Sequence, residues 1–160
     1  MFTLKNNSAQ LYLFFAVFFC GCISGGTHGS IRCYEYSISK NNLERAVTRI
    51  LATNPKIVKD SVQDRYNDTK TYISFKVNTN NTFYTYTTRY GGDTIYWYTS
   101  KVSSIYIAYA HDENANGGSA GDGGMAWYKF RLRRKVISPF EKEFIDKIDK
   151  ELGIKHTVAK

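Results

Sequence analysis

Residues 71–90 have the sequence TYISFKVNTNNTFYTYTTRY, in which two alternating runs flank a polar turn. In residues 71–78 and 82–90, β-branched or aromatic side chains recur at every second position, which is the period of a β-strand. The segment Thr79-Asn80-Asn81 between them is a turn signal. The two runs therefore predict neighbouring strands of an antiparallel sheet.

The rest of the chain adds more strands and two helices. Alternating runs at residues 30–38, 94–100, 104–111 and 125–136 predict further strands. Residues 41–52 place apolar side chains on one helical stripe that ends before Pro55, and residues 56–69 are expected to form a connector. Ser138, Pro139 and Glu141 have the spacing of a helix start, and Gly153 is expected to end that helix.

These elements follow the order β-α-β-β-β-β-β-α and predict an α+β fold. Two amphipathic helices each need an apolar surface to cover, and one antiparallel sheet of five to six strands supplies it. We therefore expect a two-layer domain with both helices packed on one face of the sheet. This single domain is expected to span residues 31–160.

The strand period also divides the predicted sheet into two faces. One face carries mostly apolar side chains, such as Ile73 and Phe75, and is assigned to the helices. The other face is aromatic and cationic and includes Tyr72, Lys76 and Tyr106. The predicted partner-binding residues on this open face are Tyr84, Tyr86, Tyr96, Tyr98, Trp127, Lys129, Arg131 and Arg133.

Two interpretations of the open face remain. Tyrosine has a high strand propensity, and cross-strand aromatic pairs stabilise a sheet whose outer face meets water. Alternatively, tyrosine and arginine are enriched in interface hot spots, and aromatic rings stack on sugars or bases, so the face would be a binding platform. The run RLRRK at residues 131–135 fits either a charged edge strand or a nucleic-acid surface.

Residues 11–22, LYLFFAVFFCGC, contain a long apolar run that ends in two cysteines. A bilayer-spanning helix needs about 20 apolar residues, whereas residues 11–19 have the length of a signal-peptide core. Gly21 directly before Cys22 resembles the lipobox of bacterial lipoproteins, including small lipoproteins of Bacteroides-like bacteria. The resemblance implies that residues 1–21 are a signal peptide and that the Cys22 thiol carries a diacylglycerol group.

The same resemblance implies a lipid-anchored protein of the bacterial cell envelope. Residues 22–30 are rich in glycine and serine and are expected to form a flexible tether. Surface lipoproteins of Bacteroides-like bacteria usually have acidic residues after the cysteine, and none follows Cys22 here. This favours the outer membrane, facing the periplasm. Plain secretion and an uncleaved anchor are the alternatives.

Charge and cysteine content limit the partners. The net charge of +8 favours anionic partners, such as nucleic acid, lipid headgroups or acidic glycans, and outside the cytoplasm nucleic acid is the least expected of these. With Cys20 in the signal peptide and Cys22 acylated, Cys33 has no partner for an internal disulfide. It is expected to be a small buried hydrophobe, with a reactive or intermolecular thiol as the alternative.

Two further patterns are weaker. Residues 112–117, DENANG, match the opening of a calcium loop, but position twelve is Gly123, where such a loop ends with glutamate. A mobile or partner-contacting loop at residues 112–124 is expected instead. His111 beside Asp112 is a candidate pair for a hydrolase. No metal site and no cofactor are predicted.

The sequence therefore favours a non-enzymatic, lipid-anchored envelope protein. Its partner would be a protein or an anionic glycan, bound through the open sheet face and the 112–124 loop. An immunity-type lipoprotein that neutralises a toxin and a small envelope hydrolase that uses His111 are the alternatives.

Overall fold

The computed structural model describes residues 29–59, 72–121 and 124–159. The predicted signal peptide, Cys22 and residues 23–28 lie outside these ranges. The described residues form an antiparallel sheet with strand order β2-β3-β4-β5-β1-β7, and β6 pairs with β5. The strands are β1 (Arg32–Tyr36), β2 (Ile57–Lys59), β3 (Tyr72–Thr79), β4 (Thr82–Tyr90), β5 (Ser103–Asp112), β6 (Gly117–Gly118) and β7 (Thr157–Val158).

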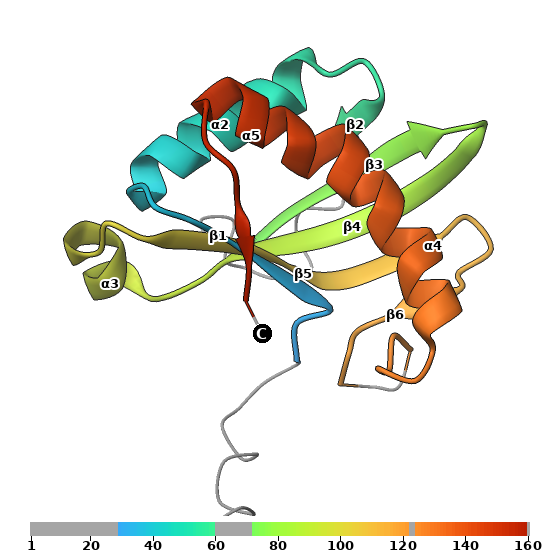
Figure 1. Ribbon diagram of the computed structural model, residues 1–160. Coiled ribbons are helices and arrows are strands. Elements are labelled where there is room, and N and C mark those ends of the chain that lie inside the picture. The colour runs from blue at the N-terminus through green and yellow to red at the C-terminus, as the bar shows by residue number, and fades with distance from the viewer. Residues whose placement is uncertain (1–28, 60–71, 122–123, 160) are drawn as a thin grey trace, which may run out of the picture.

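Helices cover one face of this sheet (Figure 1). They are α2 (Lys40–Thr53) and a long C-terminal helix made of α4 (Phe130–Phe140), the π-helical turn η2 (Glu141–Ile145) and α5 (Asp146–Leu152). A short helix, α3 (Thr94–Thr99), lies at one end of the sheet. The predicted α+β class, with one antiparallel sheet and the helices on one face, is confirmed.

The β3–β4 hairpin forms as residues 71–90 predicted. Asn80 and Asn81 have positive φ angles of 53° and 60°, which the type I′ hairpin turn requires at both of its central positions. Asparagine tolerates this conformation better than most residues because its short polar side chain bonds locally. The turn pairs Thr79 with Thr82 and sets the register of the whole hairpin.

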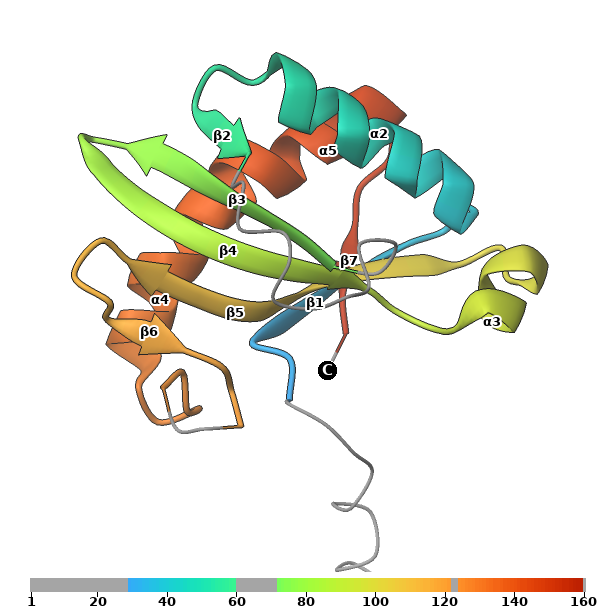
Figure 2. The same ribbon diagram turned by 180° about the vertical axis from the view of Figure 1, so that it is seen from behind.

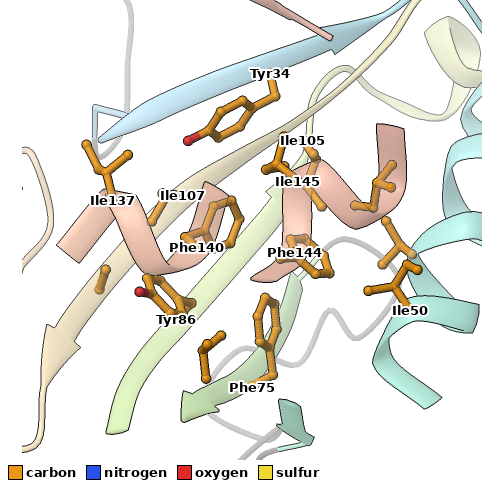
Figure 3. Packing of buried hydrophobic residues seen from close by; sticks show 14 of the residues in the cluster. Tyr34, Ile50, Phe75, Tyr86, Ile105, Ile107, Ile137, Phe140, Phe144 and Ile145 are labelled. Carbon is orange, nitrogen blue, oxygen red and sulfur yellow. The ribbon is translucent and has the colours of Figure 1, made fainter. Parts of the chain in front are cut away.

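The core lies between the sheet and the C-terminal helix (Figure 3). Phe75 on β3 packs against Phe144, with 4.6 Å between ring centroids, and Tyr86 on β4 lies 5.0 Å from Phe140. The Tyr86 hydroxyl donates a hydrogen bond of 2.7 Å to the Val136 carbonyl. The polar end of this buried tyrosine is therefore satisfied by the covering helix.

The expected open-face positions of Tyr84 and Tyr86 are wrong, because these side chains are only 8% and 0% exposed. The register pairs Phe75 with Tyr86 and Val77 with Tyr84. Directly opposed residues project from the same face of a sheet, so both tyrosines point toward the helices with Phe75 and Val77. Neither tyrosine is available to a partner.

Two predicted strands are helical. Residues 94–100 form α3 instead, because the Asp93 carboxylate accepts a hydrogen bond of 2.8 Å from the Tyr96 backbone N–H and caps a helical turn. Residues 125–136 form turns and the first part of α4. In addition, β2 forms within the segment that is expected to be a connector.

The C-terminal helix begins earlier than predicted, at Phe130, and Pro139 lies inside it. Proline has no backbone N–H, so Pro139 cannot donate to the Lys135 carbonyl four residues before it. The wider π-helical turn η2 follows directly after this position. The helix ends as predicted at Gly153, whose φ of 66° is left-handed.

Candidate binding site at the start of helix α4

A tight turn presents a row of aromatic and basic side chains to solvent just before α4. Met125 is fully buried and anchors the turn, and its backbone N–H bonds to the Ser119 carbonyl at 2.9 Å. The Lys129 N–H then bonds to the Ala126 carbonyl at 2.9 Å, and Lys129 precedes the helix. The turn thereby directs the residues after Met125 away from the core.

The resulting patch is called the Trp127 surface, and its residues are Trp127, Tyr128, Lys129, Phe130, Arg131 and Arg134. Trp127 is 84% exposed and Phe130 is 68% exposed, which is unusual for such large rings. The Arg131 guanidinium lies 6.0 Å from the centroid of the Phe130 ring. Among the described residues, neither Arg131 nor Arg134 forms an ion pair.

Arg133 holds this turn against the beginning of the domain. Its guanidinium donates to the Met125 carbonyl at 2.7 Å and also to the Ile31 carbonyl. Ile31 itself bonds through its N–H to the Ile107 carbonyl at 2.9 Å. The predicted site residue Arg133 therefore positions the Trp127 surface, and its charge is not neutralised by any carboxylate in the described ranges.

A hollow of about 550 Å³ adjoins the Trp127 surface. It is lined by Arg32, Trp127, Phe130, Arg133, Arg134, Ile137, Ser138 and Glu141. Glu141 already has two partners, the Arg32 Nε at 3.1 Å and the Tyr34 hydroxyl at 3.1 Å. Because three arginines face one glutamate, the hollow keeps a positive potential that suits an anion.

The structure brings together only some of the predicted partner-binding residues. Trp127, Lys129, Arg131 and Arg133 are close together, on a turn and helix and not on a strand. Tyr96 and Tyr98 lie on α3, at the opposite end of the sheet from the start of α4 in both views (Figures 1 and 2). Tyr98 is 84% exposed, and Tyr96 is less so.

Sequence reasoning missed Tyr128, Phe130 and Arg32 as members of the site, and it considered Arg134 only as part of the basic run at residues 131–135. The strand period places Tyr128 and Phe130 on the helix-covered face of a strand that does not form. A usable signal was present, because residues 125–137 contain five Lys or Arg residues and no Asp or Glu. A segment that carries only positive charges indicates a surface that binds an anionic partner.

The face of the sheet opposite to the helices is also aromatic and basic, although it lacks the predicted partner-binding residues. The Arg89 guanidinium lies 5.4 Å from the Tyr72 ring and 5.9 Å from the Tyr106 ring. Tyr72 and Tyr106 belong to the predicted open face, and the register places Arg89 opposite both. All three side chains are half-buried, so this face is less accessible than the Trp127 surface.

The Asp112 carboxylate is held by hydrogen-bond donors of the protein. Its side chain is buried, and its carboxylate accepts hydrogen bonds from the Asn114 and Asn116 N–H groups at 3.1 and 2.9 Å and from Lys135 Nζ at 2.9 Å. These are donors, whereas a cation would need the same oxygens free. In the described part of the chain no cluster of three possible metal ligands occurs. Gly123 lies outside it.

The contacts of Asp112 predict a specific loss of stability in acid. The Lys135 hydrogen bond, opposed by burial and aided by Asn116, lowers the pKa of Asp112 from 3.8 to about 2. A lowered pKa means that the unfolded chain binds the proton first, so the stabilisation is complete above about pH 4 and is lost as the pH falls through 2. The free energy of unfolding, measured with urea, should be well below that of the wild type for Asp112→Asn at pH 7 and close to it at pH 2. A constant difference would contradict this.

His111 and Asp112 do not form a catalytic pair in this structure. Adjacent residues of a strand point to opposite faces, so Asp112 is buried while the His111 ring lies on the other side beside Tyr109. The His111 Nδ1 lies 2.8 Å from the Asp112 backbone carbonyl and not from its carboxylate. Another pair, His156 and Asp149, does meet, at 2.9 Å between Nδ1 and Oδ2.

The His156–Asp149 pair stabilises the end of the chain. Asp149 also accepts a hydrogen bond of 2.9 Å from the Tyr36 hydroxyl, and the His156 ring meets the Tyr34 ring edge-on at 5.2 Å. The pair thereby joins α5 and the segment before β7 to β1.

Cys33 on β1 is a free thiol that is half-buried and not fully buried as expected. Burial raises the pKa of the Cys33 thiol. A raised pKa disfavours the thiolate, which is the reactive form of cysteine. The structure therefore gives no support to a reactive role for Cys33.

The fold and site define an α+β domain with an exposed aromatic and basic surface beside its first strand. No known protein family, no curated protein and no solved structure matches the chain. In the described part of the chain, no helix has both the length and the apolar character that a membrane crossing requires.

Proposed function

We propose that the chain is a lipid-anchored protein of the bacterial cell envelope that binds an anionic partner through the Trp127 surface, without catalysis of its own. The observation that carries this proposal is the concentration of exposed Trp127, Tyr128 and Phe130 with Arg131 and Arg134 beside a basic hollow. Tryptophan, tyrosine and arginine are the residues that most often supply binding energy at interfaces.

Charge supports an anionic partner. The chain carries a net charge of +8, and residues 125–137 contribute five of its Lys and Arg residues and no Asp or Glu. Of the basic residues in this segment, Lys135 alone is paired with a carboxylate of the described chain, that of Asp112, at 2.9 Å. Arginine guanidinium groups bind carboxylates, sulfates and phosphates through two parallel hydrogen bonds, so the chemistry suits an acidic glycan, an acidic protein surface or a lipid headgroup.

The envelope location rests on the lipobox-like sequence that ends at Cys22. A diacylglycerol group on Cys22 would supply the two acyl chains that stable anchoring needs. We also propose that the protein is anchored in the outer membrane and faces the periplasm, because no acidic residue directly follows Cys22. A protein held in this way meets its partner at a membrane.

A charge-reversal series tests the binding surface. Arg131→Glu/Arg134→Glu changes the net charge as much as Lys147→Glu/Lys150→Glu, which alters positions on α5. On a column of immobilised heparin, used as a polyanion probe, we expect the first variant to elute at clearly lower salt than the second, because local contacts with anionic groups release counterions. Elution of both variants at the same salt would show that only the overall charge matters.

A further inference from the structure

We propose that the anionic partner is the layer of anionic phospholipid headgroups in the membrane that holds Cys22, and that the Trp127 surface lies against this layer. This inference rests on the proposed function and names the partner of the same site. Three features support it: the length of chain between anchor and domain, the position of the surface at the end of the domain where β1 begins, and the chemistry of the exposed side chains.

The length of chain between anchor and domain keeps the Trp127 surface close to the membrane. Ile31 is buried, and its carbonyl accepts a hydrogen bond from Arg133, which also holds the turn before Trp127. Cys22 precedes Ile31 by nine residues. A fully extended chain of that length spans about 30 Å, so acylated Cys22 cannot lie farther than this from Ile31.

The start of β1 and the start of α4 lie at the same end of the domain (Figure 1). The Arg133–Ile31 contact fixes this arrangement. A domain held at this end presents the Trp127 surface toward its anchor, whereas α2 and α5 lie farther from that end (Figure 2). Membrane contact through the Trp127 surface thus needs no rearrangement of the domain.

The side chains of the Trp127 surface are those that favour the membrane–water interface. Tryptophan and tyrosine place their rings at the headgroup level, and lysine and arginine bury their apolar stems while their charges meet phosphate. Exposed Trp127 and Phe130 would enter the layer, while Lys129, Arg131 and Arg134 would contact anionic headgroups.

Tyr98 on α3 provides a matched comparison. It is as exposed as Trp127, at 84%. However, α3 contains no charged residue, and it lies at the opposite end of the sheet from α4 (Figure 1). If exposure alone produced membrane contact, Tyr98 and Trp127 would contribute equally; the proposal assigns the contact to Trp127.

The test is sedimentation with vesicles, using residues 23–160 so that no acyl chain contributes. All side chains of the core cluster lie between Ile31 and Leu152, so this chain keeps the whole core. We expect it to sediment with vesicles of phosphatidylcholine and phosphatidylglycerol at low salt and to bind pure phosphatidylcholine about tenfold more weakly. Arg131→Glu/Arg134→Glu and Trp127→Ala/Phe130→Ala should each reduce binding about tenfold, and Lys147→Glu/Lys150→Glu and Tyr98→Ala by less than about twofold.

The outcomes separate this inference from the proposed function. If the chain fails to bind anionic vesicles but the heparin series still depends on Arg131 and Arg134, the partner is an acidic glycan or protein and only the present inference is wrong. If charge reversal on α5 weakens vesicle binding as much as reversal at Arg131 and Arg134, the membrane does not contact the Trp127 surface.

Fluorescence gives a second readout, which reports the surroundings of each tryptophan once the chain is bound. The chain has two tryptophans, so Trp97→Phe leaves Trp127 as the reporter and Trp127→Phe leaves Trp97, which is half-buried and bonded to the Gly91 carbonyl at 2.7 Å. With anionic vesicles, Trp127 emission should shift to the blue and be quenched by brominated lipid, and Trp97 emission should not change. An unchanged Trp127 spectrum on bound vesicles would overturn the proposal.

Discussion

Replacement of Tyr86 by alanine should lower the free energy of unfolding by about 3–5 kcal/mol. The ring is fully buried between the sheet and the C-terminal helix, with the Phe140 and Phe75 ring centroids 5.0 and 5.9 Å from its own (Figure 3). Truncation removes these contacts and leaves a cavity that the surrounding rigid elements cannot close. Urea unfolding followed by far-UV circular dichroism measures the effect.

Tyr86→Phe is the matched control. It keeps the ring and removes only the hydroxyl that donates to the Val136 carbonyl at 2.7 Å, so the expected loss is about 1 kcal/mol. Tyr98→Ala, at an exposed position, should change stability by about 0.5 kcal/mol or less. A loss below about 1 kcal/mol for Tyr86→Ala would mean that Tyr86 lies on the open face after all.

Asp112→Ala should cost roughly 3 kcal/mol at pH 7, because hydrogen bonds to a buried charged group contribute more than neutral ones. The variant leaves the Asn114 and Asn116 N–H groups without their acceptor and removes the partner of Lys135. These contacts join the end of β5 to α4. Chemical unfolding at pH 7 measures the loss.

Glu113→Ala is the control for Asp112→Ala, since the next carboxylate along the chain is exposed. It should change stability by about 0.5 kcal/mol or less. Addition of calcium should not restore the Asp112→Ala variant and should not stabilise the wild type. A rise in wild-type melting temperature with calcium would show that Asp112 ligates a metal and that its contacts rearrange.

The sequence contained enough information to place Tyr84 and Tyr86 correctly. A turn that pairs Thr79 with Thr82 also pairs Val77 with Tyr84 and Phe75 with Tyr86, and opposed residues share a face. Assigning the faces of β3 and β4 separately lost this constraint. The hydroxyl of tyrosine favours an outward prediction, but in this core the Val136 carbonyl satisfies the hydroxyl of Tyr86.

The strand predictions for residues 94–100 and 125–136 were wrong for a different reason. Residues 94–100 are rich in β-branched and aromatic side chains, with Tyr96, Trp97 and Tyr98 in a row, and this composition favours a strand although a short exposed helix can also carry it. Asp93 decides the outcome through a cap on the Tyr96 N–H. Residues 125–136 by themselves show no clear helical spacing. The apolar spacing that indicates a helix begins at Val136 and continues at Phe140 and Phe144, which recur every four residues and are buried.

The candidate site was predictable in composition but not in shape. The excess of aromatic and basic residues near position 130 is visible in the sequence, and it led to Trp127, Lys129, Arg131 and Arg133. The contribution of Arg32 depends on packing of β1 against α4, which brings together residues about 100 positions apart. No local pattern carries that information.

The mass of the N-terminal peptide, measured on protein purified from its native membranes, tests the proposed anchor. We predict a chain that begins at Cys22 and carries a diacylglycerol group on its thiol, which would place Ile31 within about 30 Å of the acylated cysteine. A chain that keeps residues 1–21, or one that has an unmodified Cys22, would contradict the proposal that this is a lipid-anchored envelope protein.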